Sequence, residues 1–213
     1  MPADLSILST LGTGVLLGLS AGLSPGPLLT LVVSQSLAHG VREGAKVAMS
    51  PLITDLPIIL VCALVLSRFT DHGLVLGLVS LAGAAFVALL GLSTLRTRGL
   101  QVAVGEARPQ SLLRGVLVNS LSPHPYIFWL TVGVPVMLAD WPAKPLSPAV
   151  FLAAFYASLV GAKLSVALVA GKSRALLAGP AYIWLMRAIG VMLLVFAGML
   201  VKDGVRLLGL WGG

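Results

Sequence analysis

The sequence predicts an all-α integral membrane protein, in which six transmembrane helices form two inverted three-helix repeats and helices one and four are broken by Pro-x-Pro strings. Three observations predict this fold class. Of the 213 residues, 58% are hydrophobic and 10% are charged, which is far more apolar than a soluble domain. Six apolar runs each reach the roughly 20 residues that cross a bilayer. Two strings, Ser24-Pro25-Gly26-Pro27 and Ser122-Pro123-His124-Pro125, interrupt the first and the fourth run.

The six apolar runs define the expected helices in order. The first begins close to the N-terminus, where Asp4 is the only charge, so it lacks the positive region of a secretory signal and is expected to be a retained helix. The second contains Cys62, the only cysteine, which excludes an intrachain disulfide and a Cys-x-x-Cys redox pair. The runs occupy about 5–37, 46–67, 73–95, 112–139, 148–171 and 181–208.

The basic residues predict orientation in the membrane. A net charge of +7 would suggest nucleic acid in a soluble protein, but here the basic residues lie in short loops, and we expect no nucleic-acid partner. The loops after runs one, three and five are richer in Lys and Arg than the opposite side, which predicts a cell (inner) membrane protein with both termini outside the cytoplasm. The richer side has Arg42, Lys46, Arg96, Arg98, Arg108, Arg114, Lys172 and Arg174; the other has Arg68, Lys144, Lys202 and Arg206.

A polar stretch divides the chain into two halves. Residues 97–111 are expected to form a cytoplasmic linker between a first repeat at 1–96 and a second at 112–213. Because each half has an odd number of spans, the second half must be inverted relative to the first. The two strings Leu-Ser-Pro-x-Pro, at 23–27 and 121–125, are a trace of this symmetry.

The two breaks predict a substrate site. Proline removes a helical hydrogen bond, and freed backbone groups are tolerated in a membrane only beside a polar cavity. Half-helices that begin after Pro27 and Pro125 would present positive ends suited to a carboxylate. The hydroxyls can instead bond the preceding turn, and His124 can either relay protons or stay neutral as a donor. The candidates at the breaks are Ser24, Gly26, Thr30, Asn119, Ser122 and His124.

Two charged residues lie well inside apolar runs, Asp55 beside Thr54 in the second and Lys163 in the fifth. Each costs about 2.5–3.5 kcal/mol at mid-membrane, so each needs a partner or a cavity. Both lie roughly 12–14 Å from the inner ends of their helices, which permits a pair. Asp55 is expected to carry a proton or cation or to bind a substrate ammonium, and Lys163 to be its counter-charge or a carboxylate ligand. The alternative is a permanent ion pair that joins the repeats.

Four glycines in the first run, Gly14, Gly18, Gly22 and Gly26, recur at four-residue spacing and predict a seam of close helix packing. The pattern leaves open whether the seam joins two helices of one protomer or two protomers of a homo-oligomer. The sequence lacks the HExxH, GxSxG and phosphate-loop motifs and any Cys/His cluster, so no enzyme activity, metal site or cofactor is expected.

These motifs together resemble the LysE superfamily of translocators. The resemblance is carried by the Ser-Pro-Gly-Pro string, the basic turn at 39–44, Asp55, and the stretch from Leu113 to Asn119 that leads into Ser122. It implies a six-helix inner-membrane exporter of amino acids driven by proton exchange. By motif, it implicates Pro25, Gly26, Pro27, Asp55, Asn119 and Pro123.

The chain also departs from the better-known exporters of that superfamily. Leu28 replaces the Asn that usually follows Pro-Gly-Pro, Thr54 replaces a Gly, and His124 replaces the Lys of Asn-Pro-Lys. We therefore expect a less characterised branch: a secondary transporter of a small amphoteric solute, most simply an amino acid exchanged for protons or another coupling ion. The alternatives are a metal or inorganic-ion exporter on the same scaffold and a non-transporting membrane scaffold or assembly protein.

Overall fold

The computed structural model describes residues 3–68, 73–96, 111–139, 143–172 and 179–210, and every regular element in these ranges is a helix. The predicted all-α class is confirmed for them, whereas the predicted linker falls almost wholly on residues 97–110, outside the described ranges. The elements are α1 (Ala3–Leu23), α2 (Pro27–His39), α3 (Val41–Ala48), α4 (Ser50–Ser67), α5 (Gly73–Leu95), α6 (Ser111–Leu121), α7 (Pro123–Phe128), the π-helix η1 (Trp129–Gly133), α8 (Val134–Leu138), α9 (Ser147–Lys172) and α11 (Pro180–Leu207).

Four helical stretches are long and apolar enough to cross a membrane, and the bent pair of α1 and α2 gives a fifth candidate span. These five correspond to predicted runs one, two, three, five and six. The fourth run has a different form, because α6, α7, η1 and α8 follow one another as short helices of 11, 6, 5 and 5 residues. The four continuous stretches are Val41–Leu66, Gly77–Leu95, Ser147–Lys172 and Met186–Leu207.

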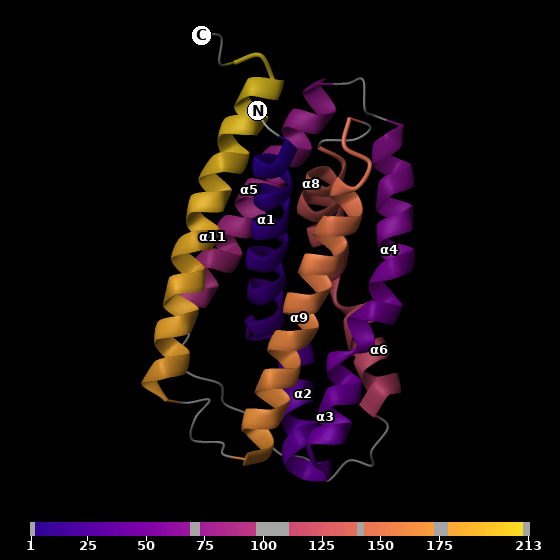
Figure 1. Cartoon of the computed structure of the whole chain (residues 1–213), viewed down its shortest axis with the longest axis vertical. Coiled ribbons are helices and arrows are strands. Elements are labelled where there is room, and N and C mark those ends of the chain that lie inside the picture. The colour runs from indigo at the N-terminus through magenta and orange to yellow at the C-terminus, as the bar shows by residue number, and fades with distance from the viewer. Residues whose placement is uncertain (1–2, 69–72, 97–110, 140–142, 173–178, 211–213) are drawn as a thin grey trace.

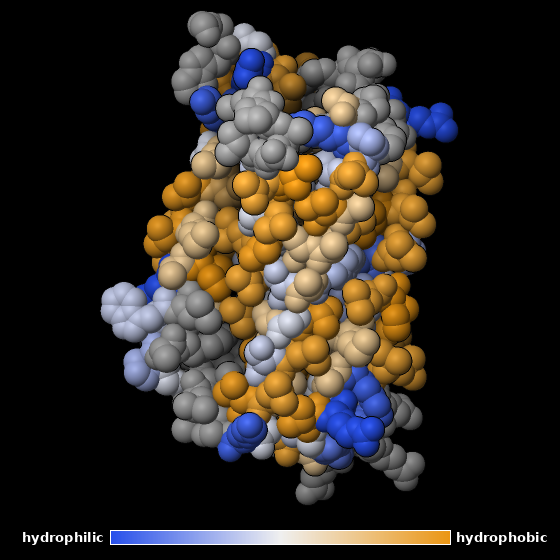
Figure 2. Space-filling model, viewed as in Figure 1, coloured by the Kyte–Doolittle hydropathy of each residue, from blue (hydrophilic) through white to orange (hydrophobic). Residues whose placement is uncertain are grey.

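The outer surface is apolar where lipid would contact it. On the face shown in Figure 2, hydrophobic residues cover the middle of the molecule and hydrophilic residues gather toward its two ends. On α4, Leu56, Leu60 and Leu64 are each more than half exposed, at 60%, 57% and 66%. Leucines that recur every four residues on one exposed face suit contact with hydrocarbon.

The helices pack in three main pairs, α1 with α9, α5 with α11, and α4 with α6 to α8 (Figure 1). The start of α1 and the end of α11 lie at the same end of the bundle. The two halves of the chain are therefore interleaved, since α1 and α4 each pack against a helix from the other half.

The glycine seam lies between α1 and α9 of one protomer. A Cβ at Gly14 would lie 2.9 Å from the carbonyl oxygen of Phe151, and one at Gly22 would lie 2.7 Å from the Ala162 Cβ. Gly26 does not belong to this seam, because a Cβ there would meet nothing within 4 Å. The four-residue spacing predicted a seam of four glycines, but the helix ends at Leu23, so the fourth leaves the packed face.

Gly18→Ala is expected to destabilise the protein, because the added Cβ would overlap the backbone carbonyl oxygen of Phe155. Overpacking of this kind costs about 1–3 kcal/mol. A lower melting temperature of the detergent-solubilised protein measures the effect. Gly12→Ala on the same helix is the matched control, since a Cβ there meets nothing within 4 Å. Equal melting temperatures for both variants would contradict the seam.

A second glycine seam joins α5 and α11 through reciprocal pairs. A Cβ at Gly190 would lie 2.9 Å from the Gly91 carbonyl oxygen, and one at Gly204 would lie 3.1 Å from that of Gly77. Gly77 and Gly91 are separated by the same number of residues as Gly190 and Gly204. The two helices thus offer each other equivalent close contacts.

Candidate functional site

The first break lies between Leu23, where α1 ends, and Pro27, where α2 begins, and the two helices are bent by 61°. Its cause is local. In a continuous helix the Ala21 carbonyl would accept from residue 25, but Pro25 has no N–H. Gly26 is extended, with φ −161° and ψ 179°, and Pro27 occupies the first turn of α2. The carbonyls at the end of α1 therefore need partners from elsewhere.

The second break is shorter. α6 ends at Leu121, Ser122 is extended with φ −78° and ψ 133°, and α7 begins at Pro123. The half-helix was predicted to start after Pro125, and this was wrong by one turn. Pro123 itself fits the first helical position, where its missing N–H is not needed, so Pro125 lies within the first turn of α7.

Asp55 is 4% exposed on α4, where Pro57 lies within the helix without interrupting it. The Asn119 side-chain amide donates to Asp55 Oδ1 over 2.9 Å, and the Thr54 hydroxyl donates to the same oxygen over 3.3 Å. The Tyr156 hydroxyl donates to Oδ2 over 3.3 Å, and the indole of Trp129 also bonds the carboxylate. Donors from three other elements therefore hold this buried carboxylate, as a charge in an apolar interior requires.

Lys163 is 3% exposed on α9 and caps the broken end of α1. Its ammonium donates to the carbonyl oxygens of Ala21 and Gly22 over 3.3 and 3.2 Å. These are the carbonyls that the first break deprives of helical partners. A positive charge at a helix C-terminus also interacts favourably with the helix dipole.

Asp55 and Lys163 do not form an ion pair in this structure. Within the described ranges the recorded salt bridge joins Lys46 to Glu43, and each of the two buried charges has its own partners. Both nevertheless line one cavity. Asp55 bonds Asn119 beside the second break, and Lys163 bonds the carbonyls of Ala21 and Gly22 beside the first.

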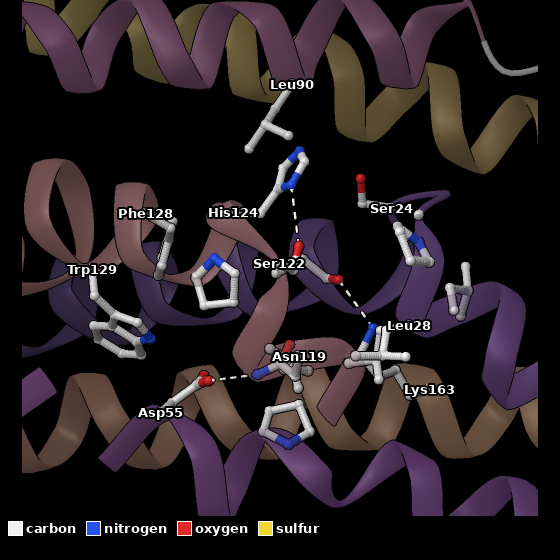
Figure 3. Close-up of a pocket in the computed structure, with 18 of the residues that line it drawn as sticks. Ser24, Leu28, Asp55, Leu90, Asn119, Ser122, His124, Phe128, Trp129 and Lys163 are labelled. Atoms are coloured by element: carbon white, nitrogen blue, oxygen red, sulfur yellow. Dashed lines mark hydrogen bonds between the residues drawn. The ribbon is translucent and has the colours of Figure 1, made fainter. Parts of the chain in front are cut away.

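The cavity has a volume of about 850 Å³ including its open mouth. Figure 3 shows Asp55, Asn119 and Lys163 on one side, with Leu90 and His124 on the other. Two of the predicted site residues, Thr54 and Pro123, do not line the cavity. Thr54 contacts the site indirectly: its hydroxyl donates to Asp55 and accepts from the Asn119 amide over 2.6 Å. Those that line the cavity are Ser24, Pro25, Gly26, Pro27, Asp55, Asn119, Ser122, His124, Pro125 and Lys163.

His124 lies at the cavity with the side chain of Ser122. The Ser122 hydroxyl and Nδ1 of His124 are 3.4 Å apart, and the imidazole lies 6.3 Å from the ring of Phe86, centroid to centroid. The imidazole thus has one polar and one aromatic neighbour, an arrangement that fits either of its two predicted roles.

The sequence did not identify the aromatic and apolar part of the site. Tyr156 precedes Lys163 by seven residues, and Phe86 precedes Leu90 by four, so each pair shares one face of a helix. This spacing was a usable signal, but apolar residues at helical spacing are common in any membrane helix. The unpredicted lining residues include Phe86, Leu90, Phe128, Trp129, Phe155 and Leu159.

A comparison with protein families gives a match to the LysE type translocator model over residues 19–204. The chain belongs to the LysE type translocator family. The match contains both breaks and both buried charges, and the resemblance seen in the sequence is confirmed. The protein is a multi-pass membrane translocator of small solutes. Comparisons with curated proteins and with solved structures gave no match.

Proposed function

We propose that this LysE type translocator is a secondary transporter of the cell (inner) membrane that exports a small amphoteric solute, an amino acid, in exchange for protons. The observation that carries the proposal is a buried acid and a buried base lining one cavity between two helix breaks. Intramembrane charges of this kind mark substrate or proton pathways. Interrupted helices at corresponding places in two halves mark transporter binding sites.

The packing supports six spans in two inverted repeats, with α6 to α8 as the fourth span. Exchanging the halves would map span one onto four, two onto five and three onto six. The contact of α1 with α9 then becomes that of α6 to α8 with α4, and the contact of α5 with α11 maps onto itself. The equal spacing of Gly77 and Gly91 on α5 and of Gly190 and Gly204 on α11 agrees with this two-fold relation. The start of α1 and the end of α11 lie at one end of the bundle, which agrees with an even number of crossings.

The same exchange relates the two buried charges. Asn119 lies four residues before Pro123, and Ala21 lies four residues before Pro25. Asp55 accepts from the side chain of Asn119, and Lys163 donates to the carbonyl of Ala21. Asp55 of the first repeat therefore bonds a residue beside the break in the second repeat, and Lys163 of the second repeat bonds the equivalent residue beside the break in the first. This pseudo-symmetry supports a chamber with one cationic and one anionic pole.

These two poles suit a zwitterion. The solute's ammonium would bind Asp55, and its carboxylate would bind Lys163 and the N-terminal end of α2 at Pro27. Asp55 is also the group we assign to proton exchange. A metal ion fits less well, because divalent ions take several oxygen ligands and Asp55 is the one carboxylate among the described lining residues.

Counterflow into liposomes that contain the purified protein tests the function. We expect a labelled amino acid to accumulate against an unlabelled pool, and an imposed proton gradient to drive net flux. Flux of divalent cations without amino-acid flux would instead support the ion exporter. The absence of any solute flux, together with a co-purifying partner protein, would support the non-transporting scaffold.

A further inference from the structure

We propose that Phe86, Leu90 and Phe128 form a subsite for the solute's side chain, and that this subsite selects amino acids with uncharged, apolar side chains. The inference rests on the proposed transport of a zwitterion. It adds the substrate class, which the two charged poles alone leave undefined, because every amino acid has an ammonium and a carboxylate.

The position of the subsite follows from α5. Phe86 and Leu90 are four residues apart and share one face of this helix, while Gly77 and Gly91 hold other positions against α11. In Figure 3, Leu90 lies across the cavity from Asp55 and Lys163. A zwitterion held by the two poles would thus direct its side chain toward α5.

Phe128 gives the subsite a rigid wall. It is 8% exposed and its ring stacks on Phe155 with centroids 5.3 Å apart and an interplanar angle of 17°. Trp129 packs edge-on against the same Phe128 ring at 5.2 Å. Stacked rings with fixed neighbours offer a preformed apolar surface, which a side chain can contact without ordering the wall first.

Charge disfavours acidic and basic side chains at the subsite. Of the residues that line the described cavity, Asp55 and Lys163 carry full charges, and both are assigned to the solute's own ammonium and carboxylate. A lysine-like or glutamate-like side chain would place another charge beside Phe86 and Leu90, where desolvation is unfavourable without a partner. His124 and Ser122 offer polar contacts at the edge of the subsite.

Competition in the counterflow assay measures the preference. One additional methylene in a hydrophobic pocket changes discrimination by roughly 10–200-fold. We therefore expect leucine and phenylalanine to compete with the labelled solute at least tenfold better than alanine, lysine or glutamate. Lysine competing as well as leucine would overturn the subsite and leave the proposed transport standing. No competition by any amino acid would overturn both.

Leu90→Asp and Leu90→Asn form a matched pair of variants. Their side chains are close in size, but only Asp offers a partner for a second ammonium. We expect Leu90→Asp to raise competition by lysine relative to leucine at least tenfold. Leu90→Asn should weaken competition by leucine without strengthening competition by lysine. Identical preferences in both variants would contradict the inference.

Phe86→Ala provides a test if a polar residue at position 90 prevents folding. It should weaken competition by leucine and phenylalanine about tenfold and leave competition by alanine within twofold. Equal losses for all three amino acids would overturn the subsite, because they would place the effect outside side-chain recognition.

Discussion

Asp55→Asn is expected to lower the rate of proton-driven export by at least 30-fold while the protein still inserts and folds. Asparagine keeps the size of the side chain but removes the negative charge and the exchangeable proton. The loss of one partner from a buried charged contact costs about 2–5 kcal/mol, which corresponds to this fall or a larger one. The rate is measured as solute flux into liposomes under an imposed pH gradient.

Asp203→Asn is the control for that change, because Asp203 lies exposed near the end of α11 and the substitution removes the same charge. It should leave flux unchanged. Asn119 and Tyr156 donate hydrogen bonds to the Asp55 carboxylate, so the melting temperature of Asp55→Asn is a second readout of the substitution. An Asp55→Asn variant with wild-type flux would remove Asp55 from both the coupling and the ammonium-binding role.

Lys163→Met is expected to lower both the melting temperature and the transport rate. The substitution leaves the carbonyls of Ala21 and Gly22 without their ammonium donor. Each buried group that loses its partner costs about 1–3 kcal/mol, so the end of α1 should loosen. Because the Lys163 ammonium is the proposed ligand of the solute's carboxylate, its loss should also raise the solute concentration needed for half-maximal flux.

Lys172→Met tests whether position matters, since Lys172 lies in the last turn of the same helix and is exposed. We expect it to match wild type in both measurements. If Lys163→Met melts at the wild-type temperature, the ammonium does not anchor the first break. If it also transports normally, Lys163 has no part in solute binding.

The positions of the helix breaks could be predicted from proline chemistry, and their geometry only in part. Pro25 and Pro27 end one helix and begin the next, as two residues without N–H groups require. At the second string α7 starts at Pro123, because a single extended residue, Ser122, is enough to make the turn. The π-helical turn after Phe128 had no signal in the sequence.

The buried charges could be identified from their cost in hydrocarbon, but their partners could not. The sequence placed Asp55 and Lys163 at similar depth, which left a direct pair open. In the structure, Asp55 instead accepts hydrogen bonds from Asn119 and Tyr156, and Lys163 donates to carbonyls of α1. Those partners depend on which helix faces which, and apolar helices with little amphipathic pattern do not specify that in the sequence.

Both breaks, as we propose, border one water-filled chamber that binds the solute. Cysteine substitution at Ser24 and at Ser122, in a chain with Cys62 replaced by Ala, tests it with a membrane-impermeant maleimide. We predict that both cysteines react, that the transported amino acid slows both reactions, and that a cysteine at the lipid-facing position Leu64 stays unlabelled. Breaks that resist labelling, or labelling that the solute leaves unchanged at both positions, would contradict the chamber and the transport mechanism built on it.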